Sequence, residues 1–93
     1  MDAELLLDRR DVLSEVAFIE RVVWLLPRRL PGSPHRFKYR LALVVGGECV
    51  MRYDNEAGKG DHRHVGDQEE AYEFVDVDKL LSDFRVDVER ILG

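Results

Sequence analysis

The stretch that decides the fold reads His35-Arg-Phe-Lys-Tyr-Arg-Leu-Ala-Leu-Val-Val45, then Gly46-Gly47, then Glu48-Cys-Val-Met-Arg-Tyr-Asp-Asn55. From Phe37 to Val45, large apolar residues occupy every second position, which is the period of a β-strand with one buried face. Two adjacent glycines favour a tight turn, because glycine adopts positive φ without steric cost. We therefore predict an antiparallel hairpin formed by residues 35–45 and 48–55.

The same alternation assigns side chains to the two faces of this hairpin. If the face that carries Phe37 is buried, then Lys38, Arg40 and Arg52 lie together on the opposite face. Cys49 falls on the buried face by this count and is expected to behave as a small apolar residue.

A helix is predicted to follow at the end of the chain, over residues 77–92. Its apolar residues recur three and four positions apart, which places them on one side of a helix: Val77, Leu80, Leu81, Phe84, Val88, Ile91 and Leu92. Asp76 stands where a carboxylate can accept a hydrogen bond from the first helical turn. The helix therefore has both a start signal and a face to bury.

The flanking segments complete an α+β domain. Residues 3–8 and 16–26 are predicted strands, although a helix over 12–26 stays open; Val22-Val23-Trp24 favours the strand. A last short strand is predicted over residues 71–75. The expected fold is a small antiparallel sheet of four or five strands with one C-terminal helix packed on one face.

Composition limits the class of protein. The chain has 93 residues, 45% of them hydrophobic and 35% charged, which suits one small globular domain. The single cysteine excludes an internal disulfide framework and fits a reducing compartment. We expect a soluble cytoplasmic protein with no membrane span, because no apolar run approaches about 20 residues.

The charge is unevenly distributed along the chain. The formal net charge is −5, which disfavours tight non-specific binding to duplex nucleic acid. Residues 21–40 nevertheless carry six basic side chains and no acidic one. Such a segment attracts phosphate locally, since screening limits the reach of each charge to about 10 Å at ~0.1 M salt. Neutralisation by the acidic ends of the chain or by an acidic partner stays an equal alternative.

The segment 53–67 is predicted to be a loop that carries chemistry, because it combines glycines with many reactive side chains. His62 and His64 form an H-x-H pair, and imidazole exchanges protons near neutral pH. If this segment is extended, the two histidines point to one side and Arg63 to the other. The pair therefore suits acid–base cleavage of RNA, with nearby cations holding the phosphate.

Other interpretations of this segment remain open. His62 and His64 could ligate a divalent metal with Asp54, Asp61 or His35, although two histidines alone are too few ligands. The sequence Gly58-Lys-Gly60 lacks the spacing of a phosphate-binding P-loop. His35 itself is expected to be exposed at the start of its strand.

Several segments resemble a known family. They are Val23-Trp24 with Pro27, Pro31-Gly-Ser-Pro-His-Arg-Phe-Lys-Tyr-Arg40, Arg52-Tyr-Asp-Asn-Glu56, Gly58-Lys-Gly-Asp-His-Arg-His64, Tyr72-Glu-Phe74 and Leu80-Leu-Ser-Asp-Phe84. Over nearly its whole length the chain resembles the TumE-like toxins of bacterial and archaeal type II toxin–antitoxin modules. The resemblance implies a single toxin domain over residues 1–93, growth arrest, and neutralisation by a helix-turn-helix antitoxin encoded nearby.

Residues and resemblance together favour a toxin that acts on RNA as a metal-independent ribonuclease with no cofactor. The expected catalytic residues are His62, His64, Lys59 and Asp61, and the expected phosphate or RNA ligands are Arg40, Arg52, Arg63 and Lys38. A non-catalytic binding or regulatory protein and a metal-dependent nuclease remain alternatives. The sequence leaves the oligomeric state open.

Overall fold

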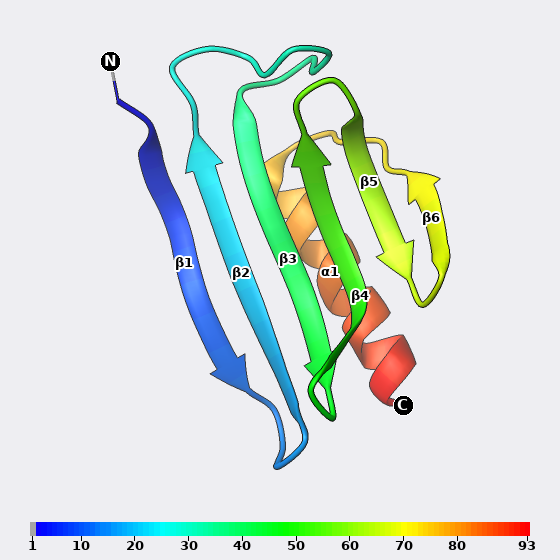
Figure 1. Cartoon of the computed structure of the whole chain (residues 1–93). Helices are drawn as coiled ribbons and strands as arrows, with labels where there is room; N and C mark the ends of the chain where they lie inside the picture. Colours follow the sequence, from blue (N-terminus) through cyan, green and yellow to red (C-terminus); the bar gives the residue numbers. More distant parts are fainter. Residues whose placement is uncertain (1) are drawn as a thin grey trace.

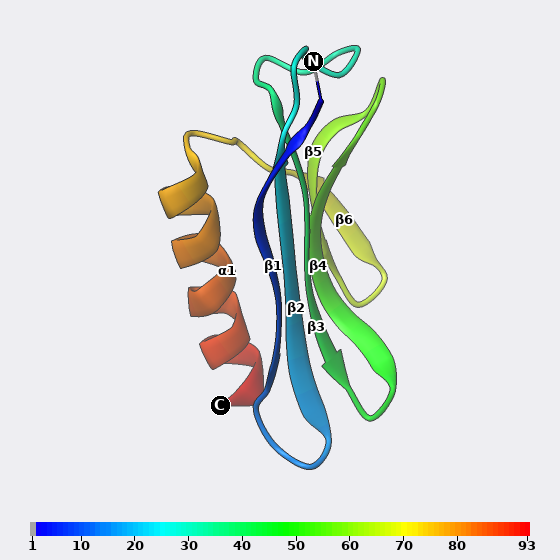
Figure 2. The same cartoon turned by 90° about the vertical axis from the view of Figure 1, so that its left-hand side faces the viewer.

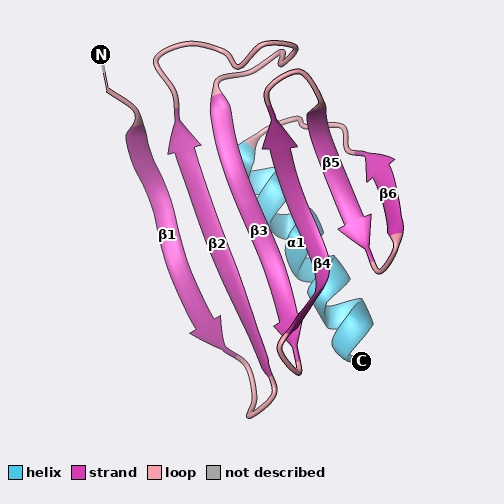
Figure 3. Cartoon of the chain, in the orientation of Figure 1, coloured by secondary structure: helices cyan, strands magenta, loops and turns pink. Residues whose placement is uncertain are grey.

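The structure, a computed structural model that describes residues 2–93, is one six-stranded antiparallel sheet with one helix against it (Figure 1). The strands follow one another in space in chain order, so each pairs with its neighbours in sequence. Figure 3 shows the same succession of strands, with the helix last. The predicted α+β architecture is confirmed, but the predicted number of strands, four or five, is wrong.

The first hairpin consists of β1 (Glu4–Val12) and β2 (Ala17–Leu25). The strand predicted over residues 16–26 is confirmed, and the alternative helix over 12–26 is wrong. β1 is longer than the predicted strand over 3–8, because pairing with β2 continues as far as Val12 and Phe18. The turn between them is held by Ser14, whose Oγ accepts hydrogen bonds from the backbone N–H groups of Val16 and Ala17.

The second hairpin, β3 (Phe37–Val45) and β4 (Glu48–Glu56), confirms the prediction for the central stretch. Gly46 and Gly47 have φ of 59° and 81°, the positive values that a two-residue hairpin turn requires. The register shifts after Leu43, so that Val44 pairs with Cys49. This irregularity leaves Cys49 exposed, and its predicted burial is wrong.

The sequence analysis missed two strands, one within the segment predicted as a long loop and one directly after it. β5 (Gly60–Val65) pairs with β4, and β6 (Gln68–Ala71) pairs with β5. β6 is polar because it is an exposed edge strand, so its backbone pairing does not require apolar side chains. The prediction of a strand over 71–75 is therefore wrong: β6 ends at Ala71, and the chain then crosses to the helix.

The helix α1 (Val77–Leu92) begins and ends as predicted. Asp76 caps it, with its side-chain Oδ1 accepting a hydrogen bond of 2.7 Å from the Lys79 N–H. Leu80, Phe84 and Val88 are buried against the sheet. In the part of the chain that the structure describes, no helix combines the length and apolar character needed to cross a membrane.

The helix covers only one side of the sheet (Figure 2). We call this side the helix face; its core residues include Tyr39, Leu41, Leu43, Met51 and Tyr53. The other side, which no element of residues 2–93 covers, is the open face. Because side chains alternate along each strand, the register decides which residues belong to the open face.

Candidate functional site

The two histidines of β5 lie on the open face. In the pairing of β5 with β4, His62 is opposite Asp54 and His64 is opposite Arg52. Their ring centroids are 6.4 Å apart. The intervening Arg63 is paired with Tyr53 and lies on the helix face. The alternation expected for residues 62–64 in an extended segment is therefore confirmed.

Register also brings the basic strand residues to the histidines. Arg40 of β3 is paired with Asp54, so that Arg40, Asp54 and His62 form one row across three strands. The next row contains Ala42, Arg52 and His64. Lys38 is two residues from Arg40 on β3, so the register agrees with the predicted sharing of one face by Lys38, Arg40 and Arg52.

Asp54 is the central carboxylate of this surface. Arg52 Nε donates to Asp54 Oδ2 at 2.9 Å, and His64 Nε2 lies 3.6 Å from Asp54 Oδ1. Arg40 is exposed and makes no ion pair or side-chain hydrogen bond with another residue of the described range 2–93. The open face thus offers one guanidinium that is held by a carboxylate and one that is available to an anion.

The two imidazoles differ in the protein groups that contact their ring nitrogens. His62 Nε2 lies 2.7 Å from the Lys59 carbonyl oxygen, and since a carbonyl only accepts, Nε2 carries the proton of this hydrogen bond. Its Nδ1 is buried 3.2 Å from Glu69 Oε1, without hydrogen-bond geometry. His64 is 26% exposed, and its Nε2 is 3.8 Å from the same Glu69 oxygen. The His62 side chain is almost equally exposed, at 22%, so the rings differ in that only the His62 ring makes a hydrogen bond to the protein among residues 2–93.

Arg63 is bound on the helix face by carboxylates. Its Nε donates to Asp87 Oδ2 of α1 at 2.7 Å, and its Nη1 donates to Glu70. Asp87 is only 5% exposed and also accepts a hydrogen bond from the Tyr53 hydroxyl. Burial by itself raises the pKa of Asp87, but the hydrogen bonds from Arg63 and Tyr53 outweigh it and lower the pKa overall. Arg63 therefore joins β5 to the helix.

Asp61 is likewise engaged away from the histidine pair. It accepts a hydrogen bond of 2.6 Å from the Tyr39 hydroxyl and lies 2.8 Å from His35 Nε2. The side chains of His35 and Asp61 are only 10% and 7% exposed, and the His35 ring stacks on Phe74 at 3.9 Å. The expected exposure of His35 is therefore wrong: its ring nitrogen Nδ1 accepts the Phe37 N–H, and Nε2 faces Asp61.

The two candidate lysines lie at the rim of the open face. Lys59 is in the turn between β4 and β5, exposed, with its Nζ 3.7 Å from Glu56. Lys38 is on β3 opposite Trp24, and its Nζ donates to the Asn55 carbonyl oxygen.

A family model described as "Toxin TumE" matches residues 2–92. The chain belongs to the TumE toxin family. The resemblance inferred from the sequence segments is thereby confirmed, and with it a toxin role. No curated protein and no solved structure is significantly similar to the chain.

In this TumE-family toxin, two acidic residues, Asp54 and Glu69, lie beside the histidine pair, a position that the sequence analysis did not predict. Asp54 was considered only as a metal ligand, and Glu69 was not singled out. Gly66-Asp67 is a two-residue turn signal that, combined with the period of two, would have paired β6 with β5 and placed Glu69 opposite His64. Among residues 2–93, no group of three or more histidine, cysteine or acidic side chains is arranged to hold a metal ion.

Proposed function

We propose that this TumE-family toxin acts on RNA as a metal-independent ribonuclease. The observation that carries the proposal is the position of His64 beside Arg52 of its own row and Asp54 of the next row, two strands from the available guanidinium of Arg40. Proton carriers and cations placed together are what cleavage of an RNA phosphodiester requires.

In the proposed reaction a neutral imidazole removes the proton from a ribose 2′-hydroxyl, and the oxygen then attacks the adjacent phosphorus. The bond from phosphorus to the 5′-oxygen breaks, and a second, protonated imidazole donates its proton to that oxygen. The products are a 2′,3′-cyclic phosphate and a 5′-hydroxyl, so neither water nor a metal ion enters this step.

We assign the first proton transfer to His64, whose Nδ1 makes no hydrogen bond within residues 2–93. Asp54 Oδ1 lies 3.6 Å from Nε2 of this ring, and we assign it the role of orienting the imidazole once RNA is bound, as a carboxylate does for a catalytic histidine. His62 contributes after RNA displaces the Lys59 carbonyl from its Nε2.

The remaining predicted residues take supporting parts. Arg40, Arg52, Lys38 and Lys59 hold phosphate along the open face. Asp61 and Arg63 position β5 from behind, through their contacts with Tyr39 and Asp87.

The TumE family membership also supports a partner. We propose that the toxin arrests growth in the cytoplasm and is neutralised by a helix-turn-helix antitoxin encoded beside it. A neighbouring reading frame with a helix-turn-helix pattern is the first check, and co-purification of its product with this chain is the second.

One assay separates the proposed reaction from its alternatives. The purified chain and its His62→Ala/His64→Ala variant are incubated with RNA, with and without a chelator, and both are checked for folding by circular dichroism. Cleavage in chelator by the parent chain alone supports the proposal. Cleavage only without chelator favours a metal-dependent nuclease that uses the H-x-H pair.

Absence of cleavage by the parent chain in either condition overturns the reaction and favours a non-catalytic binding protein. One observation already favours that second candidate: both nitrogens of His62 face the protein itself, one toward Lys59 and one toward Glu69.

A further inference from the structure

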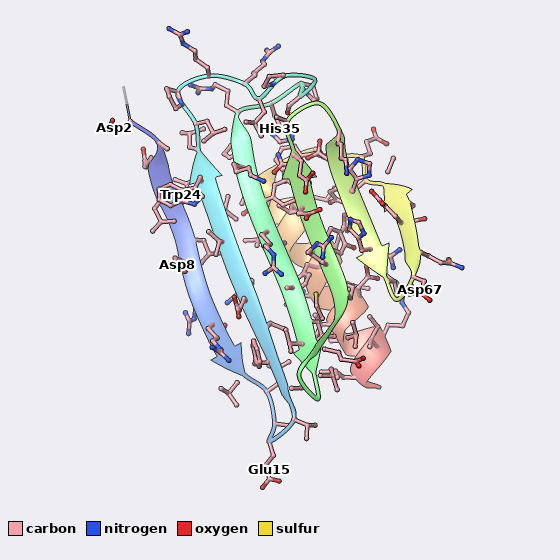
Figure 4. All side chains as sticks on the ribbon, in the orientation of Figure 1. Asp2, Asp8, Glu15, Trp24, His35 and Asp67 are labelled. Atoms are coloured by element: carbon pink, nitrogen blue, oxygen red, sulfur yellow. The ribbon has the colours of Figure 1, made fainter. Side chains whose placement is uncertain are left out.

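The open face carries one large exposed aromatic side chain that the proposed chemistry does not use. Trp24, the only tryptophan of the chain, lies near the end of β2 and is 36% exposed (Figure 4). Its register partners are Leu5 on β1 and Lys38 on β3. Lys38 and Arg40 are two residues apart on β3 and therefore share a face. Trp24 is opposite Lys38, so it lies on the same open face as Arg40 and His64.

The ring of Trp24 is free to stack. Within residues 2–93 it has no aromatic or cation–π partner. Phe18, on the same face of β2, differs: the Arg10 guanidinium covers its ring at 3.9 Å from the centroid. Of these two aromatic residues, only Trp24 offers a face to a ligand.

The surroundings of Trp24 are basic. Lys38 is directly opposite, and Arg40 is exposed two positions further along β3. The connector from β2 to β3 begins just after Trp24 and carries three more exposed arginines, Arg28, Arg29 and Arg36. The open face also carries acidic residues: Asp8 and Asp54 lie one row further from the connector, Glu20 and Glu69 lie in the row of His64, and Glu56 lies opposite Gly60 at the end of β4.

An aromatic platform beside a row of cations is how proteins bind single-stranded nucleic acid, because each base has a face to stack and each phosphate a charge to neutralise. In a duplex the bases are stacked on one another and are not available. Strand spacings of about 4.8 Å and a rise of about 3.3 Å per residue put Trp24 roughly 20 Å from His64. A few nucleotides of single strand cover that distance.

We propose that Trp24 stacks on a base of single-stranded RNA and that Lys38 and Arg40 hold the backbone between this base and His64. The inference rests on the proposed function, for which it names the substrate class. Trp24 is accordingly a binding residue and takes no part in proton transfer.

The single tryptophan provides a direct test. Its fluorescence is followed while the chain is titrated with a single-stranded 2′-O-methyl RNA dodecamer, which the proposed reaction cannot cleave. The same titration is repeated with that dodecamer annealed to its complement and with inorganic polyphosphate, which supplies charge without bases. Binding is measured independently by the anisotropy of a labelled dodecamer.

We expect quenching by the single strand, little by the duplex and none by polyphosphate. Trp24→Ala is expected to weaken binding of the labelled strand roughly tenfold, the size of one base–aromatic stack, and Trp24→Phe to restore most of it. Val86→Ala, an exposed apolar change on α1, is the matched control and is expected to leave binding unchanged.

Binding of the single strand without quenching, or equal quenching by polyphosphate, would overturn the stacking. An emission change caused by a purified antitoxin and by no oligonucleotide would assign the surface to a protein instead. If the 2′-O-methyl strand quenches the fluorescence but the chain does not cleave the same sequence as unmodified RNA, the stacking proposal stands and the ribonuclease proposal is overturned. The two proposals can therefore fail separately.

Discussion

Arg63 stands between two histidines in the sequence, yet its Nε donates to Asp87 on the opposite side of the sheet, at 2.7 Å. The contact crosses from β5 to α1 and is partly buried, with Tyr53 as a third member. It links the strand that carries the histidines to the helix. The stability of the open face therefore depends on a polar contact behind it.

Replacing Asp87 by asparagine is expected to destabilise the fold by about 3 kcal/mol, because this buried carboxylate is the charged acceptor of hydrogen bonds from both Arg63 and Tyr53. For a domain of this size, that corresponds to a decrease in melting temperature of more than about 10 °C. Thermal unfolding of Asp87→Asn beside Glu89→Gln, an exposed change on the same helix, measures it. A decrease as small as that of Glu89→Gln would show that the contact contributes little.

The loss of unfolding free energy in Asp87→Asn is expected to depend on pH. The pKa of Asp87 is lower in the folded chain than the value of about 3.9 usual for an unfolded chain. A group of this kind stabilises the fold above its unfolded pKa, and the stabilisation is lost as the pH falls through the folded pKa. The difference in unfolding free energy between parent and Asp87→Asn should be constant from pH 7 to 5 and shrink below about 4. A constant difference down to pH 2 would contradict this assignment.

His64 is expected to be the more important of the two histidines. We expect His64→Ala to slow cleavage of RNA by about 10²–10⁴-fold, the usual contribution of a general acid or base. His62→Ala should have a smaller effect, because its nitrogens face Lys59 and Glu69 before RNA binds. Cleavage rates of both variants, measured with folded protein, decide the order; a larger loss in His62→Ala would reverse the assignment.

Arg40 is predicted to bind phosphate directly. For single-stranded RNA, each phosphate contact adds about 0.7 to the slope of log affinity against log salt concentration. Arg40→Ala should therefore weaken binding and reduce that slope by about 0.7. Arg85→Ala, which removes an exposed arginine from α1, is the matched control. An equal change of slope in both variants would mean that only overall charge matters.

Asp61 is predicted to contribute to the stability of the fold and not to the cleavage step. In Asp61→Asn, the Tyr39 hydroxyl and His35 Nε2 lose a charged acceptor, at a cost of about 1–3 kcal/mol. Well below the melting temperature, the cleavage rate per folded molecule should be close to that of the parent chain. Chemical denaturation and a cleavage assay on the same preparation separate the two effects. A severe loss of rate in a fully folded variant would return Asp61 to the reaction.

Much of this protein follows from local pattern in the sequence. The hairpin of β3 and β4 was predictable because two glycines interrupt an alternating run, and the helix because its apolar spacing and its Asp76 cap agree. The placement of His62 and His64 on one side needed only the period of a strand. Each of these features depends on neighbours within a few residues, which the sequence displays directly.

The tertiary structure decided what depends on distant partners. Arg63 and Asp87 are 24 residues apart, and His35 and Asp61 are 26 apart, so no local pattern shows that each pair is joined. The strands β5 and β6 form because they extend an existing sheet edge, although their composition is that of a loop. Which face the helix covers, and hence which face presents the histidines, is set by the burial of Leu80 and Phe84 on the core. Periodicity fixes the sides of a strand, whereas only packing decides which side remains in water.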